Sequence, residues 1–206
     1  MGVMSACNAG EIVDDTLQSI NVGDISGVSE GLKRGLDINF ADQDGNTLLI
    51  LAARSGSNEI VALLLNAGAK IYPSNAFGDT ALLVASFGGF EKIVDALLAK
   101  SASLGASPQA WTPLHYAAFA GHTRLVTKFL ALGSPVNAAT NIGLTPLIVA
   151  SMQGHIDVVK SLLSQGADPS LSDANGKTAI NHALAHANTD IADLLRSASA
   201  SRITPK

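Results

Sequence analysis

The chain has 206 residues, of which 47% are hydrophobic and 15% are charged, and its formal net charge is -4. A charged fraction well below the roughly 25% of average chains predicts a surface with exposed apolar side chains. The acidic balance and the lack of a Lys/Arg cluster argue against a nucleic-acid partner, and no apolar run approaches the roughly 18 residues of a membrane span.

The first ten residues are small and polar, and we predict a disordered N-terminus over 1–10. Within it, Met4-Ser5-Ala6-Cys7 resembles the end of a bacterial lipoprotein signal. Cys7 is the single cysteine, so we expect no internal disulfide. The compartment stays unassigned: cytoplasmic if the chain is complete, and periplasmic or lipid-anchored if an N-terminal signal was removed.

A helix pair is expected next, over 11–22 and 25–33. It lacks the signature of the later repeats but ends in Gly35-Leu36-Asp37-Ile38-Asn39, as they do. Terminal repeats of a stacked array carry a polar outer face. Polar residues are present here at Asp14, Asp15, Gln18 and Asn21. We therefore predict an N-terminal capping repeat over 11–41.

From residue 42 onward one unit recurs. Its threonine returns at intervals of 33, 32, 33 and 33 residues, at Thr47, Thr80, Thr112, Thr145 and Thr178. Threonine is a good helix N-cap, and Pro113 and Pro146 follow at the first helical position. Glycines end the first helix at Gly56, Gly89, Gly121 and Gly154, and the second at Gly68, Gly133 and Gly166. Each unit is thus predicted to form two short helices that must stack on neighbours to bury their apolar faces.

The clearest unit, Thr112-Pro113-Leu114-His115-Tyr116-Ala117-Ala118-Phe119-Ala120-Gly121-His122, resembles the ankyrin repeat, and Gly166-Ala167-Asp168 matches a second part of that pattern. The turn residues Asp42, Asn75 and Asp173 match too. The run that begins at Trp111 is also similar to exported bacterial ankyrin proteins. The resemblance implies an all-α fold, an ankyrin-repeat solenoid of helix pairs with projecting β-hairpin-like fingers and about six repeats including two caps.

On this pattern we predict one continuous domain. It holds four full repeats, at 42–74, 75–106, 107–139 and 140–172, and a C-terminal capping repeat and tail at 173–206. The largest departure lies near 99–111, where one residue is missing, Ser101 replaces the helix-ending glycine and Ala110 replaces the finger glycine. We expect that finger to bend differently.

Five histidines raise the question of chemistry. The resemblance implies structural roles for His115, His122 and His155, because the ankyrin pattern itself has histidine there. His182 and His186 lie four residues apart and are the remaining metal candidates, but no third ligand stands at motif spacing. A nucleophile elbow and a glycine-rich dinucleotide loop are absent. We predict no enzyme activity and no cofactor.

On the first helix of three repeats, a large apolar side chain points away from the packed face, and folding alone does not explain it. With Leu114 at zero on a helical wheel, Ala117 and Ala118 lie within about 60° of it, whereas Phe119 lies near 140°. Phe87 and Met152 occupy the same position in their repeats. In the ankyrin family this position and the finger tips line a concave groove that binds partners.

The resemblance therefore implies a set of partner-binding residues. Its apolar members are Phe77, Phe87, Trp111, Phe119, Leu132, Ile142, Leu144 and Met152. Its polar rim is Arg54, Asp79, Gln109 and Gln153.

We predict a non-enzymatic protein–protein interaction module that binds an apolar segment of a partner in this groove, as an adaptor, inhibitor or partner-stabilising factor. Three alternatives remain. The same patch forms a homodimer, the chain binds a small molecule or metal, or the apolar side chains shield one another.

Overall fold

The computed structural model describes residues 6–104 and 111–203, with side chains over 10–104 and 111–200. The chain divides into two compact units, the N-terminal unit (1–102) and the C-terminal unit (103–206). The boundary falls in the junction where the repeat pattern departs most. The expected single continuous domain and the predicted repeat bounds stay predictions.

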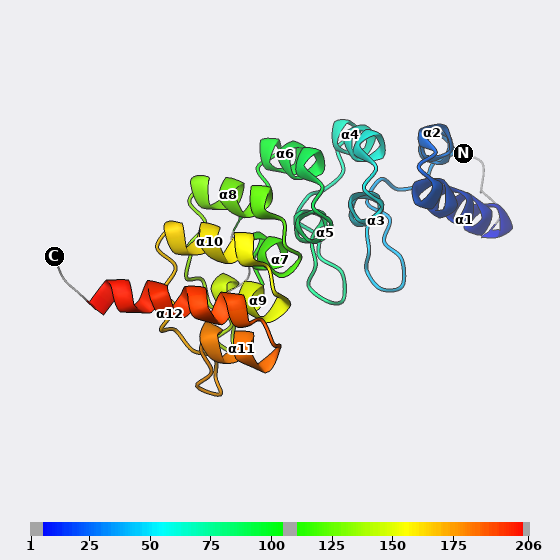
Figure 1. Ribbon diagram of the computed structural model, residues 1–206. Coiled ribbons are helices and arrows are strands. Elements are labelled where there is room, and N and C mark those ends of the chain that lie inside the picture. Colours follow the sequence, from blue (N-terminus) through cyan, green and yellow to red (C-terminus); the bar gives the residue numbers. More distant parts are fainter. Residues whose placement is uncertain (1–5, 105–110, 204–206) are drawn as a thin grey trace. The chain divides into compact units, whose positions relative to one another are not determined.

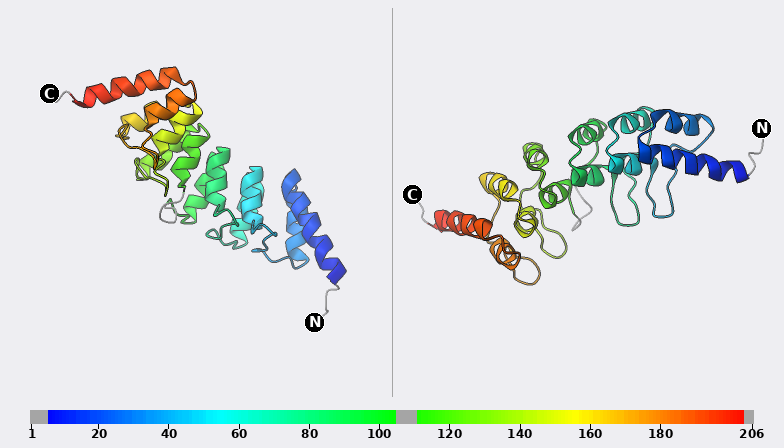
Figure 2. Two further views of the ribbon diagram at one scale, coloured as in Figure 1. Left: turned by 90° about the horizontal axis from the view of Figure 1, so that it is seen from below. Right: turned by 45° about the vertical axis from the view of Figure 1, so that its right-hand side comes forward.

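The N-terminal unit is built from three helix pairs. They are α1 (Ala6–Val22) with α2 (Ile25–Lys33), α3 (Leu48–Ser55) with α4 (Asn58–Asn66), and α5 (Ala81–Gly88) with α6 (Glu91–Ala99). The first helices pack in the order α1, α3, α5, and the second helices in the order α2, α4, α6 (Figures 1 and 2). Long loops, the fingers, lead into α3 and α5.

The C-terminal unit repeats this plan. Its pairs are α7 (Pro113–Phe119) with α8 (Thr123–Ala131), α9 (Pro146–Gln153) with α10 (Ile156–Ser164), and α11 (Ala179–Ala185) with α12 (Thr189–Ile203). Helix α9 lies between α7 and α11, and α10 lies between α8 and α12. Across the described residues of both units the regular structure is helical and β pairing is limited to isolated bridges, which confirms the all-α class.

The predicted helix starts are confirmed. The hydroxyl oxygens of Thr47, Thr80, Thr112 and Thr145 each accept a hydrogen bond from the backbone N–H three residues later. At Thr178 the Asn181 side-chain oxygen accepts from the threonine N–H and hydroxyl instead, at 2.9 Å each. Each arrangement gives polar groups at a helix end a partner, and this fixes where the first helix of a repeat begins.

The helix ends follow the glycine pattern, with two exceptions. Gly56, Gly89 and Gly154 cap their helices at φ of 74°, 73° and 81°. Where the repeat lacks glycine, Ser101 and Ala187 adopt the same left-handed conformation at φ of 67° and 59°. A side chain is strained there, so the stacking of the repeats overrides the local preference of these two residues.

The core of each unit runs along the stripe that the helical wheel predicts. In α7, Leu114, Ala117 and Ala118 are fully buried. Apolar residues of the second helices, such as Val159 and Leu162 in α10, complete it. The polar residues predicted for the outer face of the N-terminal cap are exposed.

Both ends of the chain are more helical than expected. Helix α1 begins at Ala6, so residues 6–10 of the predicted disordered segment are helical; Ala6 and Ala9 are good helix formers. Helix α12 continues to Ile203, through residues expected to be a polar tail. No helix in the described ranges has both the length and the apolar character needed to cross a bilayer.

Candidate partner-binding site

The fingers that the structure describes are shaped by the side chain at their first residue. In the N-terminal unit, Asp42 Oδ1 accepts hydrogen bonds from the N–H groups of Asp44 and Asn46, at 3.0 and 2.8 Å. Asn75 makes the same pair of bonds one repeat later, and so does Asp173 in the C-terminal unit. These residues are therefore turn formers, because their oxygens replace backbone acceptors that the loop lacks.

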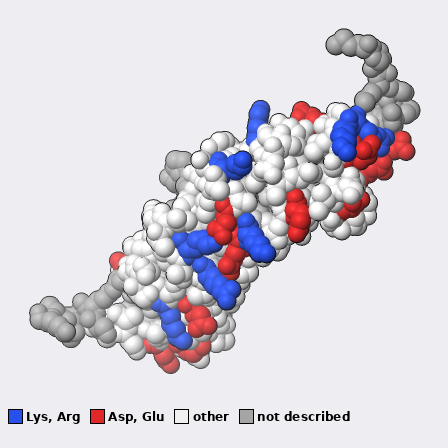
Figure 3. All heavy atoms as spheres, turned by 90° about the horizontal axis from the view of Figure 1, so that it is seen from above, with Lys and Arg blue, Asp and Glu red and all other residues white. Residues whose placement is uncertain are grey.

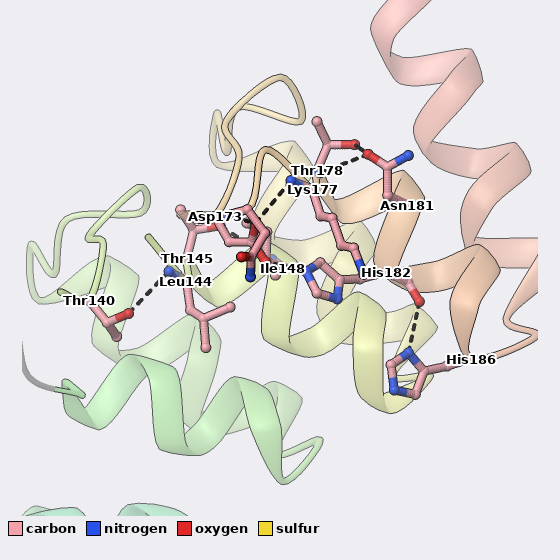
Figure 4. Close-up of polar contacts among 11 residues, drawn as sticks. Thr140, Leu144, Thr145, Ile148, Asp173, Lys177, Thr178, Asn181, His182 and His186 are labelled. Atoms are coloured by element: carbon pink, nitrogen blue, oxygen red, sulfur yellow. Dashed lines mark hydrogen bonds and ion pairs between the residues drawn. The ribbon is translucent and has the colours of Figure 1, made fainter. Parts of the chain in front are cut away.

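The finger at 140–145 differs, since Thr140 stands where the others have Asp or Asn. Its hydroxyl accepts from the Leu144 N–H at 3.1 Å (Figure 4). The predicted unusual finger that includes Ala110 lies outside the described residues, and so does the rim residue Gln109.

The fingers of the N-terminal unit are tied side by side. The Ala76 N–H donates to the Asp44 carbonyl at 2.8 Å, and the Asn75 side chain donates to Asn46 at 2.9 Å. Arg54 of α3 also donates to Asn46, at 2.8 Å. The predicted rim residue Arg54 is thus exposed but anchored at the base of a finger.

Four predicted site residues lie in the N-terminal unit. Phe77 at a finger tip is 77% exposed, and Phe87 on α5 is 49% exposed. Asp79 is half-buried, and Arg54 completes the set. This unit therefore presents two large aromatic side chains to solvent within one repeat.

In the C-terminal unit the aromatic residues gather together. The Trp111 ring lies 5.4 Å from Phe119, edge to face, and 5.2 Å from Tyr116, measured between ring centroids. Trp111 and Phe119 are both half-buried. Two of the predicted partner-binding residues are thus brought into contact, and each covers part of the other.

The other predicted residues of this unit differ in exposure. Leu132 and Ile142 are 54% and 52% exposed. Leu144 and Met152 are half-buried, whereas Gln153 is exposed. The Ala174 N–H donates to the Ile142 carbonyl at 2.9 Å, which ties the tips of two neighbouring fingers together.

Sequence reasoning missed two aromatic residues. Tyr116 contacts Trp111 and lies three residues before Phe119, so the helical wheel that identified Phe119 also places Tyr116 on its face. Tyr72 is 66% exposed and donates to the Ser101 carbonyl at 3.3 Å. It precedes its finger, where the helical period does not apply.

Two histidines of the ankyrin pattern, His115 and His155, join neighbouring repeats. His115 Nε2 lies 3.0 Å from the Leu144 carbonyl oxygen, and its Nδ1 accepts from the Thr112 N–H at 3.3 Å. His155 Nε2 lies 2.9 Å from the Phe119 carbonyl oxygen. Burial lowers the pKa of His115 below its ordinary value, against the raising effect of the Leu144 bond. The neutral His115 ring thus links two neighbouring repeats through hydrogen bonds.

The two metal candidates are engaged in other bonds. His182 Nε2 lies 2.9 Å from Asp173 Oδ2 in a buried pair, and His186 Nδ1 donates to the His182 carbonyl at 2.9 Å (Figure 4). The Lys177 N–H and then the His182 side chain lower the pKa of Asp173. In the parts of the chain that the structure covers, no group of three or more His, Cys, Asp or Glu side chains could hold a metal ion.

Comparison with known proteins agrees with this architecture. A family model described as ankyrin repeats (3 copies) matches residues 3–109, 67–140 and 114–205. A 55-residue stretch is 40% identical to serine/threonine-protein kinase 12 of Arabidopsis thaliana, over 27% of this chain and 12% of that protein. The chain thus spans only a small part of that relative. The family matches cover most of the sequence, and the chain belongs to the ankyrin-repeat family, whose repeats are protein–protein interaction modules.

Proposed function

We propose that this protein binds an apolar segment of a partner protein, and that Phe77 and Phe87 are its principal anchors. The observation that carries the proposal is the 77% exposure of Phe77 at the tip of a finger whose backbone is fixed by Asn75. A large aromatic side chain on a rigid support is typical of interface hot spots, because little further conformational entropy is lost on binding.

In the C-terminal unit the Trp111–Phe119 cluster contributes a preformed aromatic platform. Edge-to-face contact holds the two rings against each other, while both residues stay partly accessible. Ile142 and Leu132 add exposed apolar surface. Arg54, Asp79 and Gln153 supply polar groups that orient a partner. Gln109 is the fourth residue proposed for this polar rim.

The proposal is tested by affinity capture from the native cell extract, with captured proteins identified by mass spectrometry. We expect Phe77→Ser with Phe87→Ser to remove a defined partner that the unaltered chain retains. The matched control, Val22→Ser with Leu184→Ser, removes two apolar side chains that are 65% and 44% exposed outside the proposed site. Equal loss in both double variants would instead indicate nonspecific apolar adhesion.

Association through apolar anchors should depend only weakly on salt, because screening acts on charges and not on buried apolar area. Light scattering on the purified protein tests the homodimer alternative. A mass of one 21.0 kDa chain at micromolar concentration contradicts it. A dimer that the Phe77/Phe87 variant dissociates would show that the partner is a second copy.

A further inference from the structure

The N-terminal unit contains a second surface feature, a solvent-open hollow of about 590 Å³ between α1 and the first finger. Val13, Asp14 and Leu17 of α1 line one side, and residues 40–44 of the finger line the other. Val13 and Leu17 are four residues apart, so they share a face of α1. With Phe40 they form an apolar floor, and all three are half-buried. We call this feature the α1 hollow.

Carboxylates surround that floor. Asp42 is engaged in the finger turn and with the Asn46 side chain. Asp14 and Asp44 are exposed, and within the part of the chain that is described their carboxylates have no hydrogen-bond or ion-pair partner. Their negative charge is therefore directed to solvent beside an apolar surface.

The surrounding cations do not neutralise this rim. No Lys or Arg is among the described residues that line the hollow. Arg34 pairs with Asp15 at 3.6 Å, and Arg54 donates to Asn46. The N-terminal unit as a whole holds 12 acidic and 6 basic residues, a net charge of -6, whereas the C-terminal unit holds 5 acidic and 7 basic residues, a net charge of +2. The hollow thus lies in the unit that attracts cations.

The acidic rim and apolar floor of the α1 hollow suit an arginine side chain better than a metal ion. A metal ion needs several ligands converging on one point, and in the described residues the acidic groups here do not converge in that way. A long side chain with an apolar stem and a delocalised charge fits better, because the stem covers the floor and the guanidinium reaches the rim. The Phe40 ring adds an aromatic surface on which a guanidinium can stack.

We propose that the α1 hollow receives an arginine side chain of the partner protein. The Asp44 carbonyl accepts from the Ala76 N–H, so the rim of the hollow adjoins the finger whose tip is Phe77. An arginine held here would lie next to an apolar segment held by Phe77. The inference rests on the proposed function, and it specifies a partner segment in which an arginine stands close to apolar residues.

The test uses the full chain and two pentapeptides, acetyl-Gly-Leu-Arg-Leu-Gly-amide and its citrulline counterpart. Citrulline keeps the shape of arginine but removes its charge. NMR of the Val13 and Leu17 methyl groups and the Phe40 ring follows the binding. We expect saturable shifts at these groups, with the citrulline peptide about five-fold weaker or more, since each exposed ion pair contributes only modestly. Absence of shifts with the arginine peptide, or equal affinity for both peptides, would overturn the proposal.

A matched pair of variants locates the charge effect. Asp14→Asn with Asp44→Asn should weaken the arginine peptide about five-fold. Glu30→Gln with Glu59→Gln changes the net charge equally at two exposed positions outside the hollow and should leave the affinity within about two-fold. Equal weakening in both would show a general electrostatic effect and would overturn a specific site.

The two proposals fail separately. The Phe77→Ser/Phe87→Ser variant retains the hollow, so it should bind the arginine peptide as the unaltered chain does even while it loses the apolar partner. Loss of partner capture with unchanged shifts at Val13 and Leu17 supports both proposals. If the variant still captures the partner, only the proposal that Phe77 and Phe87 are anchors is contradicted. If the unaltered chain shows no shifts at Val13 and Leu17, only the proposal that the hollow binds arginine is contradicted.

Discussion

Residues 1–102 and residues 103–206 use the same helix pair and finger, but different side chains join their successive repeats. In the N-terminal unit, Asn46 and Asn75 are bonded to each other, and the Phe90 ring covers Gly56 so closely that a Cβ there would lie 2.7 Å from it. In the C-terminal unit, His155 takes the place of Phe90 and covers Gly121 in the same way, while also donating to the Phe119 carbonyl. All five histidines of the chain lie in this unit.

One architecture thus tolerates titratable and non-titratable connections at the same positions. The two units also present two kinds of aromatic surface, the exposed Phe77 and Phe87 and the half-buried Trp111 and Phe119. Uncharged residues cover most of the face shown in Figure 3, as expected for a chain with 15% charged residues. The exposure of their aromatic side chains therefore distinguishes the two units, in addition to their histidine content and net charge.

The largest expected effect comes from the aromatic cluster. Trp111→Ala should lower the free energy of unfolding of the C-terminal unit by about 2 kcal/mol, because it removes ring contacts with Tyr116 and Phe119 and leaves a partly collapsed space. Phe77→Ala, which removes a mainly exposed ring, should change it by less than about 0.5 kcal/mol. Urea unfolding followed by circular dichroism measures both, and equal losses would contradict the contrast between the units.

Acid should weaken the C-terminal unit first. The pKa of His115 is lowered in the folded state, so the unfolded chain takes up the proton more readily, and stability falls as pH drops below about 6.5. The lowered pKa of Asp173 adds a second loss as pH drops below about 4. Hydrogen exchange between pH 7.5 and 5 should show protection falling in 111–170 while 48–99 changes little.

His115→Asn is the matched control for this pH effect. Asn181 holds the corresponding position in the last repeat and accepts from the Thr178 N–H there, so asparagine can retain the cap without titrating near neutral pH. The variant should flatten the response of 111–170 between pH 7.5 and 5. A response of the same size in the variant would assign the pH effect to other groups.

Glycine at the two strained positions should stabilise each unit. Ser101→Gly and Ala187→Gly remove side chains from left-handed backbone at φ of 67° and 59° and should each raise the free energy of unfolding by about 1 kcal/mol. Gly68→Ala should lower it by about 1 kcal/mol, because an added Cβ meets open space there and only the φ of 88° opposes it. Thermal and urea unfolding test these changes, and a destabilised Ser101→Gly would show that the serine side chain contributes to the junction.

The smallest expected effect concerns Ser134. Its hydroxyl is buried and, in the region that is described, has no hydrogen-bond partner, whereas Ala69 and Ala167 stand at the same place in other repeats. Ser134→Ala should therefore raise stability by about 0.5 kcal/mol. A loss of stability instead would indicate that an ordered water satisfies the hydroxyl, which a high-resolution crystal structure would show.

The sequence by itself determined the helix pairs, their caps and the buried stripe. These depend on local chemistry, namely a threonine oxygen that accepts from a nearby N–H, a glycine that permits positive φ, and a helical period of 3.6 residues. The predicted helix over 25–33 agrees with α2, and Leu114, Ala117 and Ala118 are buried as expected.

Only the tertiary structure decided how the apolar surface is used. The helical wheel placed Phe87 and Phe119 in equivalent positions, yet Phe87 is 49% exposed whereas Phe119 is half-buried. The same holds for the hollow beside α1, whose two sides are about 25 residues apart in the chain. Exposure and contact depend on which side chains neighbouring segments bring to a position, and a repeat pattern read one unit at a time does not contain that information.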